Sequence, residues 1–265
     1  MQFGAMNFPI RPILEEIEEF FRLGFDYVEL AMDPPMAHHS LLYPIRSRIQ
    51  QLLKDRGLGL VCHLPTFVTT ADLTQSLRDA SVREMLRSLE VAASLGAKKA
   101  VLHPSAASGL GGYVLDTVKG YAFDFFAQMV DAAQTLEIRL CLENMFPRNV
   151  LGVEPEDVEE IFSVFPSLMM TLDTGHANIG DKRGKRLSTL ATRFGDRISH
   201  LHFSDNHGKI DDHLAIGQGS IDFALVIGQL KAAGYDETLT LEVFDTDRRA
   251  LVKSRQKIQA MLDGC

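Results

Sequence analysis

Strand-like and helix-like segments alternate eight times along this chain, and this alternation limits the folds that the chain can adopt. The short apolar runs occupy residues 1–6, 27–32, 59–65, 99–105, 139–145, 167–174, 198–205 and 239–244. Longer segments between them repeat apolar residues with the period of an amphipathic helix, as at residues 13–25 and 82–98. Since parallel strands are joined by long crossovers, usually helices, this order predicts an α/β fold with a parallel sheet.

The length of the chain indicates how these units are arranged. No proline-rich or low-complexity linker divides the 265 residues, so we expect a single domain over residues 1–265. Eight βα units in this length match a single (β/α)8 TIM barrel, which takes about 250 residues. A doubly wound open sheet is the alternative. It is disfavoured because no G-x-G-x-x-G element follows the first strand.

Composition excludes several classes of partner. The chain has 27 Lys and Arg against 35 Asp and Glu, a net charge of −8, which gives no general attraction to nucleic acid or to anionic membranes. Its three cysteines form no C-x-x-C pair, which favours reduced thiols. We find neither a secretory leader nor an apolar run of membrane-spanning length, so we expect a cytoplasmic protein. Assembly into a homo-oligomer stays open.

Polar residues end most of the predicted strands. In a TIM barrel the functional groups lie at the C-terminal ends of the strands, so these residues should meet at one mouth. They are His63, His103, Glu143, Asp173, His176, His202, Asp211, His213 and Glu242. A single histidine at a strand end is more often a hydrogen-bonded structural residue, and Asp173 could simply cap a helix. Nine such groups at consecutive strand ends instead indicate a functional site.

The four carboxylates in this set predict bound cations. Carboxylates that share one mouth repel each other unless positive charge lies among them. Two divalent ions would cancel the four charges, and a third would leave the site positive. Imidazole and carboxylate together suit transition metals better than Ca²⁺ or Mg²⁺. We therefore expect one to three divalent ions per chain, with Zn²⁺ or Mn²⁺ favoured.

The same strand ends carry a family resemblance over the whole chain. The motifs "HLP", "LHP", "LEN", "LDTGHA", "HFSDN", "DDHLAIGQGSID" and "LEVF" follow one another on consecutive strands. Together they resemble the xylose isomerase-like TIM-barrel superfamily. This superfamily includes sugar isomerases and epimerases as well as AP endonucleases of the endonuclease IV type.

The resemblance implies two ligand patterns. On the endonuclease pattern, all nine residues at the strand ends match the ligands of a trinuclear centre. On the epimerase pattern, Glu143, Asp173, His202 and Glu242 would hold one metal, and the two glutamates would exchange protons with the substrate carbon. His176 and Lys209 would then orient hydroxyl or phosphate groups, although some epimerases have an arginine near the position of Lys209.

The loops decide which reaction we prefer. Endonucleases of this type penetrate DNA with basic and wedge-like loops, but the loop at residues 32–42 contains no Lys or Arg. The loop at residues 64–73 offers only Phe67 as a wedge. We therefore predict a metal-dependent sugar or sugar-phosphate isomerase or epimerase that works through an enediolate, with catalytic Glu143, Glu242 and His176. A metal-dependent phosphodiesterase acting at abasic DNA is the alternative, and a non-catalytic sensor is a third.

Further residues are candidates for contact with substrate. Glu29, at the end of the second strand, could bind a substrate hydroxyl or be a polar residue of the rim. The basic run "KRGKR" at 182–186 could grip a phosphate, although a solvated loop is the preferred interpretation. The backbone of "GQG" at 217–219 could cradle a phosphate, but a tight turn before a helix capped by Asp222 is preferred.

Overall fold

A closed barrel of eight parallel strands forms the centre of the molecule, in the order β1 to β8. The structure is a computed structural model that describes residues 1–181 and 183–264. The strands are β1 (Gln2–Met6), β2 (Tyr27–Ala31), β3 (Gly59–His63), β4 (Lys99–Leu102), β5 (Arg139–Glu143), β6 (Met169–Asp173), β7 (Ile198–Phe203) and β8 (Thr238–Leu241). Pairing of β1 with both β2 and β8 closes the barrel, so the predicted TIM barrel is confirmed.

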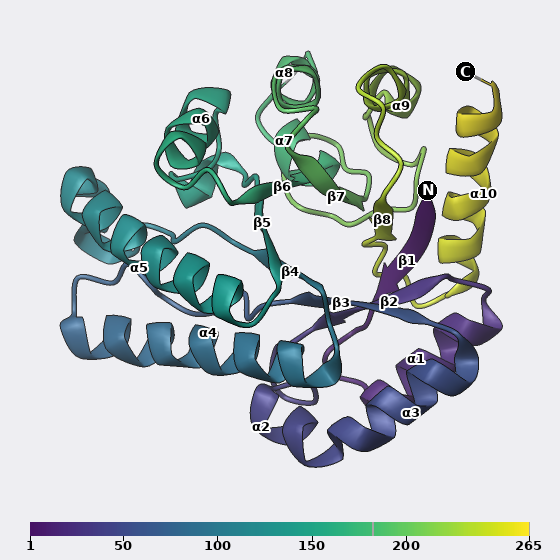
Figure 1. The fold of residues 1–265 in the computed structure, drawn as a ribbon. Helices are drawn as coiled ribbons and strands as arrows, with labels where there is room; N and C mark the ends of the chain where they lie inside the picture. Colours follow the sequence, from purple (N-terminus) through teal and green to yellow (C-terminus); the bar gives the residue numbers. More distant parts are fainter. Residues whose placement is uncertain (182, 265) are drawn as a thin grey trace.

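Helices surround the barrel and cover its outer face (Figure 1). They are α1 (Ile13–Arg22), α2 (His39–Leu42), α3 (Arg46–Arg56), α4 (Gln75–Leu95), α5 (Leu115–Thr135), α6 (Pro155–Val164), α7 (Thr174–Asn178), α8 (Lys185–Arg193), α9 (Phe223–Ala232) and α10 (Arg249–Gly264). Short 3-10 turns lie at Tyr43–Ile45, Gly109–Tyr113 and Pro147–Asn149. Within the described ranges, no helix is long and apolar enough to cross a membrane.

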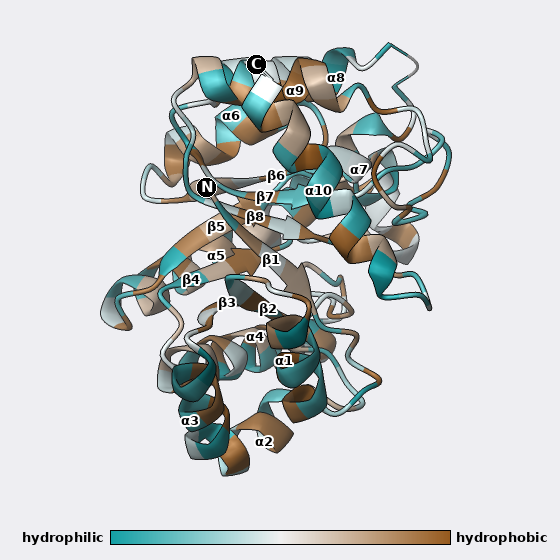
Figure 2. Ribbon diagram, turned by 90° about the vertical axis from the view of Figure 1, so that its right-hand side faces the viewer, coloured by the Kyte–Doolittle hydropathy of each residue, from teal (hydrophilic) through white to brown (hydrophobic). Residues whose placement is uncertain are grey.

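Each large helix buries one apolar stripe against the strands. In α1 the buried residues Ile13, Ile17 and Phe20 recur at intervals of three and four, which places them on one face of the helix. Hydrophilic residues on the helices alternate with this apolar stripe (Figure 2). The core therefore lies between the helices and the outside of the barrel.

Inside the barrel, an apolar layer lies below the polar groups at the C-terminal ends of the strands. Tyr27, Val61 and Val101 form a small apolar cluster inside it. Gly4 makes room for the aromatic ring, because a Cβ atom at this position would lie 2.2 Å from the ring of Tyr27. Glu29 follows Tyr27 by two residues and so faces the interior one layer higher. This apolar cluster forms a base below the polar groups.

Candidate metal centre

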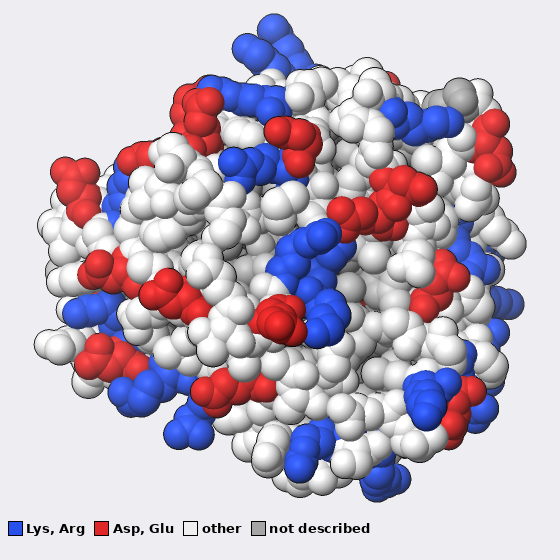
Figure 3. Space-filling view, viewed as in Figure 1, with Lys and Arg blue, Asp and Glu red and all other residues white. Residues whose placement is uncertain are grey.

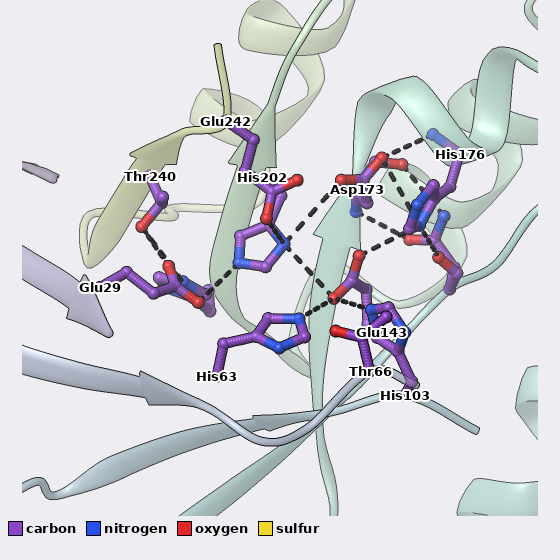
Figure 4. Close-up of polar contacts among 12 residues, drawn as sticks. Glu29, His63, Thr66, His103, Glu143, Asp173, His176, His202, Thr240 and Glu242 are labelled. Atoms are coloured by element: carbon purple, nitrogen blue, oxygen red, sulfur yellow. Dashed lines mark hydrogen bonds and ion pairs between the residues drawn. The ribbon is translucent and has the colours of Figure 1, made fainter. Parts of the chain in front are cut away.

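The mouth of the barrel holds a cavity of about 410 Å³ at the C-terminal ends of the strands. Seven of the nine predicted residues line it, namely His63, His103, Glu143, His176, Asp211, His213 and Glu242. The other two, Asp173 and His202, are fully buried beside them. The structure thus brings all nine together, and Figure 4 shows most of them. Their role as metal ligands stays a prediction.

His202 turns its Nδ1 atom toward three carboxylates. This atom lies 3.1 Å from Glu242 Oε1, 3.3 Å from Glu143 Oε2 and 3.8 Å from Asp173 Oδ2. In a tetrahedral zinc site with bonds of about 2.0–2.2 Å, neighbouring ligand atoms lie about 3.4 Å apart. The ligand atoms of Asp173, His202 and Glu242 all lie within 4.8 Å of one another, and Glu143 adjoins them through His202. These side chains come from the ends of β5, β6, β7 and β8, and their spacing is compatible with ligands around one ion.

Two atoms of this group are buried without a hydrogen-bond partner among the described residues. They are His202 Nδ1 and Asp173 Oδ2. Leaving a buried polar atom unsatisfied costs roughly 1–3 kcal/mol. A cation between the two atoms would satisfy both, so the residues fit a divalent transition metal. Asp173 also caps α7, since its Oδ1 accepts a hydrogen bond from the His176 backbone N–H. The two interpretations of Asp173 are therefore compatible.

Main-chain carbonyls orient three of the histidines. In His63, His176 and His213, Nδ1 lies 2.8, 3.0 and 3.1 Å from a carbonyl oxygen, to which it can donate. Nε2 of each ring faces a carboxylate, so a metal ion can bind the lone pair of Nε2 once this nitrogen is deprotonated, while Nδ1 is held by the protein.

Glu143 gathers a second group of ligands. Its Oε2 lies 3.2 Å from His63 Nε2 and 3.1 Å from His103 Nε2. Burial lowers the pKa of His63, but the hydrogen bond to Glu143 and the charge of that carboxylate outweigh burial and raise the pKa to about 9. In the ion-free protein, the His63 imidazole is therefore protonated on both nitrogens and positively charged at neutral pH.

Asp211 gathers a third group from the loop after β7. Its Oδ2 lies 2.9 Å from His213 Nε2 and 3.3 Å from His176 Nε2. Burial lowers the pKa of His213, yet the hydrogen bond to Asp211 and the charge of Glu242 raise it to about 9. The mouth thus offers three adjoining groups of ligand atoms, which suits the predicted one to three ions.

The protonation of these side chains depends on whether a cation is bound among them. Burial raises the pKa of Asp173 to about 7; the charge of His176 opposes this shift, and the charges of Glu143 and Glu242 add to it. Without a cation, protons on the carboxylate and the histidines offset the negative charge. Metal binding would displace these protons, so affinity should weaken as the pH falls.

Glu29 lies elsewhere than the sequence suggested. It is fully buried, and its carboxylate is bonded to protein on both oxygens. Oε1 lies 2.9 Å from His202 Nε2, and Oε2 lies 2.8 Å from His200 Nε2 (Figure 4). Thr240 also donates a hydrogen bond to Oε2. Glu29 is therefore a support beneath His202 and is not available to a substrate hydroxyl.

We expect Glu29→Gln to lower metal affinity by about 10- to 100-fold, the usual cost of losing a carboxylate that orients a ligating histidine. The carboxylate holds the His202 Nε2–H, which leaves Nδ1 free for a cation. Glutamine retains the shape but can present its amide N–H to the ring instead. Zn²⁺ titration of the metal-free variant measures the effect, and an unchanged affinity would contradict this role.

Lys209 and the loop candidates lie away from the mouth cavity. Lys209 is exposed and lines a different cavity between α8 and α9, together with Arg183. From the basic run, Arg186 pairs with Glu154 and donates to main-chain carbonyls, whereas Lys182 lies outside the described residues. None of the described residues of the run lines the mouth.

The side chain of Asp205 binds the backbone N–H groups of the "GQG" turn. Its carboxylate accepts hydrogen bonds from Gly217 and Gly219 at 3.0 and 2.8 Å, so these groups are not free for a phosphate. Asp222 caps α9 through the Leu225 N–H, as the preferred interpretation proposed. The role of Asp205 was missed, although it stands within the quoted "HFSDN" motif.

Asn144 is a second residue that we did not single out from the sequence. Its side chain accepts from the Asp173 N–H at 2.9 Å and donates to the Asp173 carbonyl at 3.0 Å. Its own carbonyl receives the His176 ring N–H. Its place directly after Glu143 in "LEN" was the available signal.

The fold and the site define the class of the protein: a TIM barrel with a histidine–carboxylate centre at its C-terminal mouth. A family model described as xylose isomerase-like TIM barrel matches residues 17–263, and the chain belongs to this family.

The individual relatives include one protein named as epimerase-like and one named as an endonuclease. An uncharacterized protein of Methanocaldococcus jannaschii is 29% identical over 270 residues, which cover 99% of this chain and 90% of that protein. A solved D-tagatose 3-epimerase-like protein is 27% identical with a TM-score of 0.87, over 99% of this chain and 97% of its own. A probable endonuclease 4 of Mycoplasma pneumoniae is 24% identical, over 62% of this chain and 60% of its own length.

Proposed function

We propose that this protein is a metal-dependent epimerase or isomerase that moves a proton beside the carbonyl group of a small unphosphorylated sugar. One observation carries the proposal. Two buried glutamates, Glu143 and Glu242, approach the same His202 Nδ1 at 3.3 and 3.1 Å from β5 and from the end of β8. The likeness to a D-tagatose 3-epimerase-like structure supports an enzyme of this kind.

Proton transfer next to a carbonyl needs a base near the carbon and positive charge near the oxygens. A divalent ion held by the four core residues would supply that charge. Glu143 and Glu242 come from strands three apart around the closed barrel, so they can approach a bound substrate from different directions. One glutamate would take the proton, and the other would return a proton to the opposite face. His176, which lines the cavity between them, would hold a substrate hydroxyl.

The lining of the mouth favours a neutral sugar over a sugar phosphate. None of the 18 described residues that line the cavity is Lys or Arg. Phe8 and Phe244 stack on one wall with ring centroids 5.6 Å apart, and Phe146 packs against His176. Aromatic faces suit the C–H surface of a sugar ring or chain, whereas a phosphate dianion would find no cation in this lining.

Phosphodiester cleavage at abasic DNA is the second candidate, because the mouth contains all nine residues of the trinuclear pattern. DNA binding requires a positive surface around the mouth. The 18 described residues that line the mouth cavity include no Lys or Arg, and the chain carries a net charge of −8. On the one face of the molecule that Figure 3 shows, Lys and Arg side chains are interspersed with Asp and Glu. These charges make phosphodiester cleavage of DNA the less favoured of the two candidate functions.

One experiment separates the candidates. Protein reconstituted with Zn²⁺ or Mn²⁺ is incubated in D₂O with free ketoses, with their phosphate esters and with an abasic-site duplex. We expect deuterium at the carbon beside the carbonyl of a free sugar, and none after chelation of the metal. Exchange only into phosphate esters would contradict the substrate class. Incision of the duplex without exchange into any sugar would favour the second candidate.

A further inference from the structure

We propose that a second, peripheral metal site lies outside the barrel, where His38, His39 and Glu84 hold a Zn²⁺-class ion that fastens the β2–α2 loop to α4. These residues come from the start of α2 and from the middle of α4. Their three ligand atoms lie within 4.8 Å of one another. None of the three lines the mouth cavity, so this site is separate from the centre described above.

The geometry around Glu84 carries the proposal. Both imidazoles turn Nε2 toward the same carboxylate oxygen, Oε1: His38 bonds to it, and His39 lies 3.0 Å from it. The two rings lie next to each other and are tilted, with centroids 4.2 Å apart and an interplanar angle of 36°. Two ring nitrogens and one carboxylate oxygen thus converge on one point, and this donor set suits Zn²⁺.

His39 has an unsatisfied atom that independently points to a ligand. Its Nε2 is buried and has no hydrogen-bond partner in the described parts of the chain, although Glu84 is near. The contact has the length of a hydrogen bond but not its direction. An ion between the two residues would accept the lone pair of Nε2 directly, without requiring that direction.

Ser40 orients the other imidazole. Its hydroxyl oxygen lies 2.7 Å from His38 Nδ1, and its backbone N–H lies 3.3 Å from the same atom. The backbone N–H donates to Nδ1, so in the ion-free protein the ring hydrogen is on Nε2, which faces Glu84. A metal at Nε2 requires the other tautomer, in which Nδ1–H donates to the Ser40 hydroxyl. A water molecule can complete a four-ligand shell.

The position of the site gives the ion a structural role at the mouth. The β2–α2 loop also contains Asp33, which lines the mouth cavity and accepts hydrogen bonds from the Thr66 backbone and hydroxyl at 3.0 and 3.1 Å. Thr66 belongs to the loop that leads into α4. An ion between His38, His39 and Glu84 would join the same two βα units a second time and hold this wall of the mouth in place.

Zinc stoichiometry tests the site in the full-length protein. Metal-free wild type and the variants His39→Ala, Glu84→Gln and Glu90→Gln are titrated with Zn²⁺, and bound zinc is counted by elemental analysis. Glu90 is an exposed residue of the same helix and serves as the matched control. We expect His39→Ala and Glu84→Gln each to lose one equivalent per chain, while Glu90→Gln and the wild type bind equally.

Three results would overturn the proposal: wild-type stoichiometry in Glu84→Gln, the same loss in Glu90→Gln, or no anomalous zinc signal at these residues in a zinc-soaked crystal. If His39→Ala fails to fold, Glu84→Gln decides, because it keeps the size and shape of the side chain. Each count is compared with that of the wild type, and zinc bound at the mouth is common to all variants, so these outcomes do not depend on the proposed reaction.

Discussion

The double variant Glu143→Gln/Glu242→Gln is expected to lose most of the metal bound at the mouth and all measurable proton exchange. Each change removes an anionic oxygen that lies 3.1–3.3 Å from His202 Nδ1. Glu143 also faces His63 and His103, so its loss affects two groups of ligands. Because each glutamate is also a proposed acid or base, worth about 10²- to 10⁴-fold, the combined loss of exchange should exceed roughly 10⁴-fold.

Elemental analysis and deuterium exchange measure the two losses separately. Glu237→Ala is not a suitable control, because Glu237 binds Lys99 and Arg139 at the other end of the barrel. Glu90→Gln changes an exposed glutamate and should leave both readouts unchanged. Circular dichroism measures whether the double variant is folded, and glutamine keeps the size and shape of glutamate. Full metal retention in the folded double variant would refute the proposed ligands.

The barrel and the composition of its mouth were predictable because both depend on local patterns. Each strand and each helix can be recognised from the apolar periodicity of its own segment. Once the order of these segments indicates a barrel, the residues at the strand ends must meet at one mouth. Glu143 in "LEN" and His202 in "HLHF" could thus be placed without knowing which side chains they touch. The structure brings these residues together as expected.

Contacts between distant residues could not be predicted in the same way. Glu29 forms hydrogen bonds with two residues far away in the sequence. His202 is 173 residues from it and Thr240 is 211 residues from it. Inward-facing residues on neighbouring strands are offset by the stagger of the barrel, so sequence alone does not say which of them lie at the rim and which below it. Glu29 was therefore expected at the rim, whereas it lies buried beneath the centre.

The peripheral cluster was missed for a related reason. His38 and Glu84 are 46 residues apart, on elements that meet only when α2 packs against α4. Two adjacent histidines in a polar loop carry no signal of a partner, and an exposed loop is the common interpretation of such a pair. Only the packing of helices shows that both rings face one carboxylate.

In the loop after β7, the substitution His213→Ala should lower the rate of deuterium exchange into substrate by about 10²-fold or more. This is the lower end of the range for a group that transfers a proton or positions one that does. His213 lines the mouth, and its Nε2 lies 2.9 Å from Asp211 Oδ2. Its ring also packs on Phe244, with centroids 4.7 Å apart. Removing the ring therefore removes a nitrogen that faces Asp211 in the mouth and part of the aromatic wall.

Asp212→Ala is the matched control, because Asp212 is adjacent in the chain but forms no side-chain hydrogen bond or ion pair with the described residues. We expect its exchange rate to stay within about twofold of wild type, as for most surface substitutions. His213 has a positive φ of 47°, so alanine could also disturb the backbone. His213→Asn separates the two effects, since asparagine tolerates this conformation. If asparagine restored full exchange, or if Asp212→Ala lost as much as His213→Ala, the loop would have a structural role only, and the imidazole would not act at the mouth.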